Sequence, residues 1–139
     1  GRGVVITALP GTMDRMKEDP RFGLASKDPD GRRSALGFME GARRAVERVN
    51  AALGRRAVVA VEVHSAPRPA PSAERFAESL REMASWGWEG AALWVEHCDA
   101  ARPDGGHDKG FLALEDDMAA ARAAGAGISL NWGRSAVEG

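Results

Sequence analysis

Four short runs of apolar residues recur along the chain, each rich in Val, Ile, Leu or Ala. Runs of this length and composition, bounded by glycine, proline or charged residues, predict β-strands. The four predicted strands are Val4–Leu9, Val58–His64, Ala91–His97 and Gly127–Trp132.

The intervals between these strands carry apolar residues at helical spacing. The clearest is 34–54, where apolar residues recur at steps of three and four and Gly54 provides a C-terminal stop. A second helix is predicted to begin after Ser72, a good N-cap, and to bury Phe76, Leu80 and Met83. A third spans roughly 114–124, with acidic residues in its first turn, where the helix dipole favours negative charge, and Gly125 ends it.

Alternation of strands and helices predicts βαβ units and a parallel sheet. Four βα units are about half of a (β/α)₈ barrel, which usually has about 250 residues. We therefore predict that residues 1–139 form a single α/β domain, a partial (β/α)₈ TIM barrel of about four parallel strands alternating with helices. The sequence begins GRGVV, without an initiator methionine, and no helix follows the fourth predicted strand. We therefore expect an internal piece of a longer barrel, or a half that must associate with something.

Alternation within each strand sorts its residues onto two faces, because successive side chains point in opposite directions. In the second strand Val59, Val61 and Val63 share a face that suits contact with helices. The opposite, inward face gathers polar residues at or near the C-terminal ends of the strands, where (β/α)₈ enzymes build their sites. These residues are Thr7, Glu62, His64, Glu96 and Asn131.

Two inward carboxylates would repel each other if their strands are neighbours, because adjacent strands lie about 4.8 Å apart. Such a pair needs a cation, a shared proton or water, and carboxylates with imidazole nitrogens suit a divalent metal such as Mn²⁺, Zn²⁺ or Mg²⁺. The alternative is a polar interior layer balanced by arginines from other strands. We predict Glu62, Glu96 and His64 as catalytic residues, and Glu62, Glu96, His97 and Asp99 as metal ligands.

Alternation along the strand places the residues that follow Glu96 on different faces of the sheet. His97 would face the helix layer if the strand stays regular to its end, and Asp99 either turns toward the site or begins a turn. Cys98 is predicted to be a buried small side chain rather than a nucleophile, because no spacing ties it to an activating base.

The segments after the strands would complete the site. Residues 10–33 are predicted to form a long loop, and loops of this length in a compact domain are usually functional or mobile. The segment 102–110, RPDGGHDKG, predicts a flexible flap. Beyond the last strand, Arg134 would orient an anionic or hydroxylated substrate, and Asn131 and Trp132 would line its site.

Composition and charge limit the kinds of partner that the protein is expected to bind. The chain has 19 basic and 20 acidic residues, a net charge of -1 and no long block of either sign, which disfavours nucleic acid and anionic membranes. No stretch approaches the roughly 20 apolar residues of a membrane span, and we find no signal sequence. One cysteine cannot form an intrachain disulfide. We therefore expect a cytoplasmic protein with neither nucleic acid nor a membrane as its partner.

Four stretches carry a resemblance to a known family: VITALPGTMDRMKEDPRFGLAS, VVAVEVHSAP, WVEHCDA and ISLNWGRSAVEG. They resemble the central strands and loops of a bacterial family of unknown function, classed with the xylose-isomerase-like, sugar-phosphate-isomerase-like TIM barrels. The resemblance implies a divalent metal bound by acidic residues on the fourth and fifth strands, which match Glu62 and Glu96. Where these barrels carry an aspartate and, three places later, a histidine, this chain has Glu96 and Asp99, and Asn131 stands in place of a histidine.

Three hypotheses of function follow. The complete protein would isomerise or epimerise a sugar or sugar-like polyol, with Glu62 and Glu96 moving a proton or holding a metal and His64 assisting. Alternatively, the two glutamates would hydrolyse a glycosidic bond, which in retaining enzymes needs carboxyl groups about 5–5.5 Å apart. In the third hypothesis the chain is a non-catalytic half that associates with a second copy through its unpaired sheet edges.

Overall fold

The residues that the computed structural model describes, 2–68 and 70–133, form an open sheet of parallel strands alternating with helices. The strands are β1 (Val4–Thr7), β2 (Val58–Val63), β3 (Ala92–His97) and β4 (Gly127–Leu130). They lie in the order β1-β2-β3-β4, each parallel to its neighbour. Sequential parallel order is the arrangement of strands in a (β/α)₈ barrel, so the predicted fold class is confirmed.

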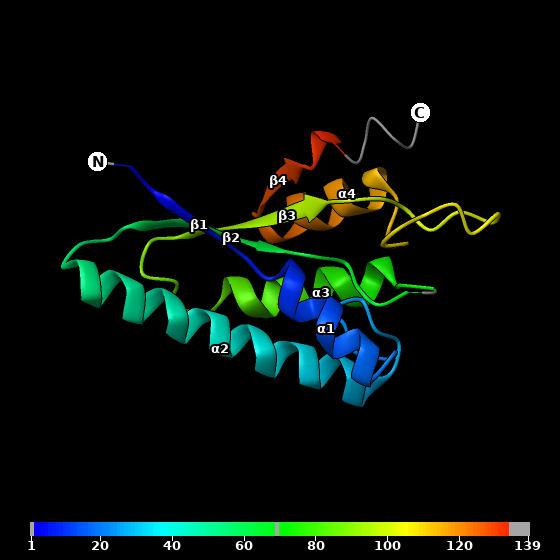
Figure 1. Cartoon of the computed structure of the whole chain (residues 1–139), viewed down its shortest axis with the longest axis horizontal. Helices are drawn as coiled ribbons and strands as arrows, with labels where there is room; N and C mark the ends of the chain where they lie inside the picture. Colours follow the sequence, from blue (N-terminus) through cyan, green and yellow to red (C-terminus); the bar gives the residue numbers. More distant parts are fainter. Residues whose placement is uncertain (1, 69, 134–139) are drawn as a thin grey trace.

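The helices are α1 (Leu9–Glu18), α2 (Pro29–Leu53), α3 (Ala73–Ala84) and α4 (Leu114–Ala124). In Figure 1, α2 and α3 lie below the sheet and α4 lies behind β3 and β4. α4 packs against α3, β3 and β4. The core between helices and strands includes Val61, Val63 and Val95 from the sheet and Phe76, Leu80 and Met83 from α3. Burying side chains of this kind contributes about 1.5–3 kcal/mol each.

Three residues act at helix ends as their types indicate. Ser72 caps α3, since its hydroxyl accepts a hydrogen bond from the Arg75 backbone N–H at 3.3 Å. Gly54 and Gly125 end α2 and α4 in the left-handed conformation, with φ of 62° and 69°, which glycine adopts without steric cost.

The segment 10–33 is not the long loop that the sequence predicted. α1 occupies its first part, and its buried residues Thr12 and Met16 are four positions apart, on one helical face. Pro10 is accommodated in the first turn, where a backbone N–H has no partner within the helix. α2 also begins earlier than predicted, because the Asp28 carboxylate accepts hydrogen bonds from the backbone N–H groups of Asp30 and Gly31.

One valine departs from the predicted division of faces. Val59 was expected to contact helices, yet it is 46% exposed. The pairing between β1 and β2 shifts there, from Val4 opposite Val58 to Val5 opposite Ala60, so Val59 is an extra residue in β2. The rest of β2 follows the prediction, with Val61 and Val63 fully buried toward the helices.

The two outer strands carry exposed apolar side chains. Val4 and Val5 on β1 are 38% and 44% exposed, and Ile128 and Leu130 on β4 are 40% and 47% exposed. Both strands have one neighbour in the sheet, so their outer backbone groups are open to pairing. Among the described residues, no helix is both long and apolar enough to cross a bilayer.

Candidate functional site

Two inward-facing residues, His64 just beyond β2 and Glu96 near the end of β3, meet in a close polar contact. His64 Nε2 lies 2.6 Å from Glu96 Oε2. The β2–β3 register produces this contact, because Val63 pairs with Val95 and the next positions, 64 and 96, therefore lie side by side. Both side chains are shielded from water, with exposed fractions of 1% for His64 and 11% for Glu96. A hydrogen bond involving an ionised group is strengthened in such surroundings.

Glu96 is held from a second side by Asn131, which follows β4. The Asn131 amide Nδ2 donates to Glu96 Oε1 at 3.1 Å. Each oxygen of the Glu96 carboxylate thus has a neighbour, His64 on one and Asn131 on the other. This fixes the orientation of the carboxylate, which a site that moves a proton or binds a cation requires.

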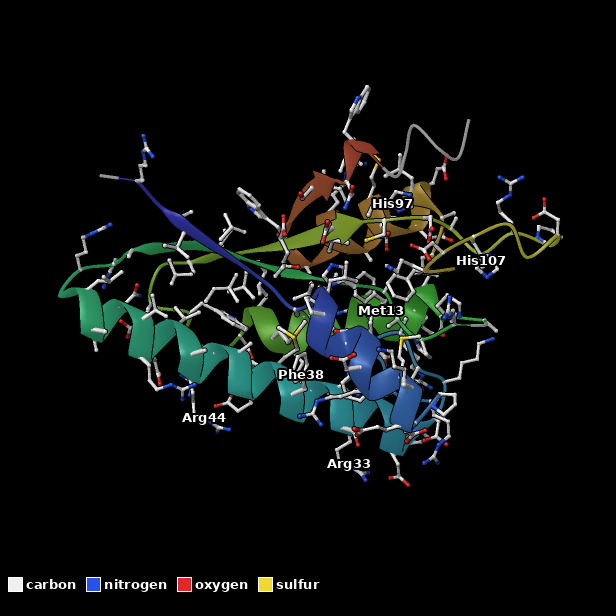
Figure 2. The ribbon with its side chains drawn as sticks, in the orientation of Figure 1. Met13, Arg33, Phe38, Arg44, His97 and His107 are labelled. Atoms are coloured by element: carbon white, nitrogen blue, oxygen red, sulfur yellow. The ribbon has the colours of Figure 1, made fainter. Side chains whose placement is uncertain are left out.

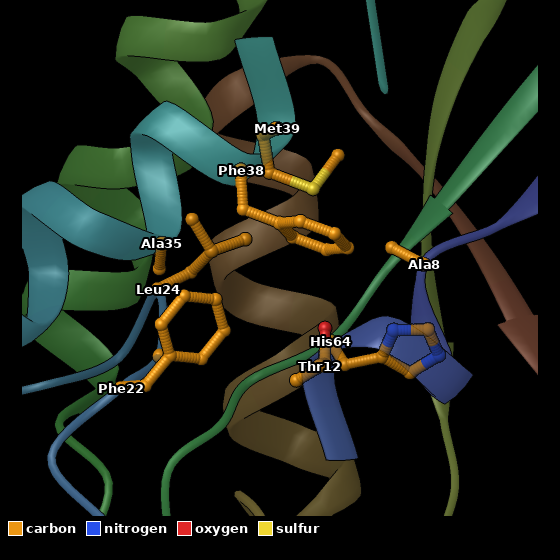
Figure 3. Close-up of a pocket in the computed structure, with 9 residues that line it drawn as sticks. Ala8, Thr12, Phe22, Leu24, Ala35, Phe38, Met39 and His64 are labelled. Carbon is orange, nitrogen blue, oxygen red and sulfur yellow. The ribbon is translucent and has the colours of Figure 1, made fainter. Parts of the chain in front are cut away.

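The second ring nitrogen of His64 faces a different environment. Nδ1 is buried and has no hydrogen-bond partner among the described residues. His64 lines a small cavity together with Ala8, Thr12 and the aromatic ring of Phe22, as Figure 3 shows. The cavity offers about 10 Å³ to the centre of a water molecule, which is room for about one water.

Cys98 adds a sulfur to this group. The ligand-type atoms of His64, Glu96 and Cys98 all lie within 4.8 Å of one another. Cys98 is buried, as the sequence predicted, but its place beside two polar side chains was missed. The signal was present in the strand parity, because Cys98 comes two residues after Glu96 and so faces the same side.

Glu62 does not lie opposite Glu96. Its register partner across the β2–β3 pair is Trp94, so Glu96 stands two residues further along, about 7 Å in the strand direction. The Glu62 side chain is half-buried, and its carboxylate has no hydrogen bond or ion pair within the part of the chain that the structure describes. The predicted carboxylate pair is therefore replaced by a carboxylate–imidazole pair, with Glu62 as a separate inward group.

His97 lies on the opposite, helix-facing side of β3, as its parity predicted. Its Nδ1 is 2.9 Å from Asp117 Oδ2 of α4, and Figure 2 shows it beside that helix. Burial raises the pKa of the Asp117 carboxyl above its usual value, although the hydrogen bond to His97 acts to lower it. The structure therefore does not bring His97, a predicted metal ligand, to the group around Glu96.

Asp99, another predicted metal ligand, is directed into the loop that follows β3. Its carboxylate accepts backbone hydrogen bonds from Asp108 at 2.7 Å, Lys109 at 2.6 Å and Gly110 at 2.9 Å. Only 5% of Asp99 is exposed. These contacts tie down the base of the predicted flap and engage both carboxylate oxygens.

Two of the predicted substrate-binding residues fall within the described chain. Asn131 contacts Glu96, as stated above, while Trp132 is 78% exposed at the end of β4. Arg134, the third, lies outside the described residues. Of the predicted substrate-binding residues, the structure therefore places Asn131 at the site.

Comparison with known proteins gives a family and one curated relative. The family described as "Domain of unknown function (DUF4862)" matches residues 1–139. An uncharacterized protein of Salmonella typhimurium, STM3670, is 35% identical over 143 residues, which cover 98% of this chain and 44% of that protein. The chain thus spans less than half the length of the relative. No solved structure is significantly similar to it.

Proposed function

Because the chain belongs to the DUF4862 family, whose description assigns no reaction, we propose its function from the candidate site. The complete protein is a sugar or sugar-phosphate isomerase or epimerase of the (β/α)₈ barrel type, related to the xylose-isomerase-like barrels. The observation that carries this proposal is the buried contact of His64 with Glu96, at the C-terminal ends of parallel strands.

The inward groups have the chemistry that isomerisation needs. Moving a hydrogen between adjacent carbons requires a base that removes a proton and a group that stabilises charge on the neighbouring oxygen. Glu62 has a half-buried carboxylate without a protein partner among the described residues, so it is the base. His64, held by Glu96, lies about two residues further along, where its imidazole would stabilise the charge that develops on the substrate oxygen.

A divalent cation is consistent with the same inward residues. The buried imidazole of His64 and the carboxylate of Glu96 are ligand types that such ions accept in proteins. A cation held there would polarise a substrate carbonyl or hydroxyl oxygen. The residues of the chain would still bind the polyol and move the proton, with Asn131 and Trp132 beside the site.

The remaining strands of the barrel would come from a longer protein. The chain covers 44% of its Salmonella relative, and both β1 and β4 leave exposed apolar side chains at the sheet edges. Additional strands would cover these side chains and close the inward face away from water. We place this complete protein in the cytoplasm, with a small carbohydrate-like substrate and neither nucleic acid nor membrane as partner.

Conversion of a sugar panel tests the proposal. The complete protein would be incubated with aldoses, ketoses, epimer pairs and their phosphates, and the products separated by chromatography. We expect one pair to interconvert, and Glu62→Gln to slow the conversion by about 10²–10⁴-fold, the usual contribution of a general base. Glu18→Gln, an exposed glutamate at the end of α1, is the matched control and should convert at the wild-type rate. Conversion of no sugar by the folded protein would refute the assignment.

The exposed sheet edges also favour a second proposal, that residues 1–139 alone associate with a second copy. Val5 and Ile128 on opposite edges are 44% and 40% exposed, and strand edges of this kind template further pairing. Light scattering of the isolated chain over a range of concentrations should show dimers or larger species. A monomer at the highest concentration would contradict this proposal.

A further inference from the structure

We propose that His64, Glu96 and Cys98 form a zinc-class metal site in which Cys98 is a thiolate ligand. The inference deepens the proposed function, because it concerns the same inward face, but it requires no catalytic activity. Cys98 was expected to be only a packing residue, and its sulfur is what decides the kind of metal.

The distances allow the three side chains to close on one ion. Their ligand atoms lie within 4.8 Å of one another. Zinc bonds of about 2.0–2.3 Å in a tetrahedral arrangement separate the ligand atoms by about 3.4–3.8 Å. The widest pair in the cluster therefore needs to close by about 1 Å, and His64 Nε2 and Glu96 Oε2, which lie 2.6 Å apart, need to separate by about 0.8 Å. Side-chain rotation can supply both movements.

The surroundings of His64 support a ligand role for its Nε2. A histidine that binds metal through one ring nitrogen usually donates the proton on the other to a fixed acceptor. The Nδ1 of His64 is buried without a protein partner among the described residues, and the ring borders a cavity with room for about one water. Thr12 lines the same cavity (Figure 3) and supplies a hydroxyl that can hold that water.

Glu96 has a comparable outer contact. Asn131 donates to Oε1, which leaves Oε2 directed toward His64. A hydrogen bond to the non-binding oxygen is the usual means of orienting a carboxylate ligand. Glu96 thus has the outer contact that orients a metal ligand, and the cavity beside His64 has room for a water that would supply one.

Charge and donor type select the metal. A thiolate and a carboxylate carry two negative charges, which a divalent ion neutralises in a site that is almost entirely buried. Sulfur, imidazole and carboxylate together suit Zn²⁺ or its substitute Co²⁺, whereas Mg²⁺ and Mn²⁺ favour oxygen ligands. Three protein ligands would leave a fourth position open to substrate or water, as in catalytic zinc sites.

Cobalt titration tests the site. The complete protein, stripped with a chelator and kept reduced with a phosphine, would be titrated with Co²⁺. We expect a thiolate-to-cobalt charge-transfer band with the visible bands of tetrahedral Co²⁺. Cys98→Ser should abolish the charge-transfer band and weaken Co²⁺ binding by about 100-fold or more. This loss exceeds the loss of about 10- to 100-fold that usually follows when a residue hydrogen-bonded to a metal ligand is replaced. His107→Gln, a histidine of the 102–110 loop, is the control and should keep both.

X-ray absorption of the zinc-loaded wild-type protein gives a second measurement that needs no variant. We expect one sulfur neighbour at about 2.3 Å and nitrogen or oxygen neighbours at about 2.0–2.2 Å. A spectrum with nitrogen and oxygen alone, no cobalt charge-transfer band, or a band that persists in Cys98→Ser overturns the site. Zinc binding without sugar conversion would refute the proposed function alone, and conversion without metal would refute only the metal site.

Discussion

The Asp99 carboxylate, which accepts hydrogen bonds from the backbone N–H groups of Asp108, Lys109 and Gly110, gives a sharp test of how the loop after β3 is held. In Asp99→Asn one oxygen becomes an amide group that carries hydrogens. The remaining oxygen can still accept from its neighbours, but at least one backbone N–H then faces a donor. The charge that strengthens the other contacts is also lost.

The size of the effect follows from the contacts. Hydrogen bonds to charged groups contribute about 1.5–3 kcal/mol each, and neutral ones about 0.5–1.5 kcal/mol. Losing one contact and weakening two others by about 1–1.5 kcal/mol each gives about 3.5–6 kcal/mol in favour of the open loop. A tenfold change corresponds to about 1.4 kcal/mol, so the open population should rise by about 300- to 20,000-fold.

Amide hydrogen exchange measures this opening directly. In Asp99→Asn, the amides of Asp108, Lys109 and Gly110 should exchange faster by that factor, up to the limit set by their protection in the wild-type protein. Core amides such as that of Val95 should keep their protection, because the loop opens locally. Wild-type exchange at the three loop amides would refute this reasoning. Loss of Co²⁺ binding in the same variant would instead indicate that Asp99 acts as a ligand, as the sequence first predicted.

Two further predictions concern stability. Gly23→Ala should destabilise the fold by about 3 kcal/mol or more in chemical denaturation, because the added Cβ would overlap the Ala66 backbone. Gly37→Ala should instead stabilise the fold by about 0.5–1 kcal/mol, because the added Cβ meets no atom within 4 Å and the position lies inside α2. Equal effects of the two substitutions would contradict this reasoning. Burial raises the pKa of Asp117 above its usual value of 3.8. Between pH 3.8 and the raised pKa, the folded state therefore binds more protons than the unfolded state, and the wild-type protein loses stability as the pH rises. Asp117→Asn should lack this decline in urea unfolding measured over pH, and a parallel decline in both proteins would show that another group causes it.

The elements of the fold were largely predictable from the sequence, because strand composition and helix ends are local signals. Ser72, Gly54 and Gly125 act at the helix ends as their residue types predicted. α1 was missed, since a proline, a glycine and many charged residues obscure the four-residue spacing of Thr12 and Met16. That pattern becomes visible only when the core on one side of the helix is known.

The sequence predicted which face of the sheet carries the candidate site, but not which of its side chains contact each other. Strand parity correctly directed Glu96 inward and His97 toward the helices, since it depends on neighbouring residues alone. The register between β2 and β3 depends on how the segment that connects them packs on the sheet, so the partner of Glu96 could not be read from sequence. The partner proved to be His64 rather than Glu62, and Asp99 entered the loop.

Proton exchange into substrate is the most direct measure of the central claim, that the inward strand ends move a proton between adjacent carbons. The complete protein would be incubated in D₂O with the sugar panel, and deuterium at carbon followed by nuclear magnetic resonance. The account predicts incorporation beside the carbonyl of at least one sugar, and a decrease of about 10²–10⁴-fold in Glu62→Gln. No incorporation above the protein-free rate, or incorporation at the wild-type rate in Glu62→Gln, would contradict it.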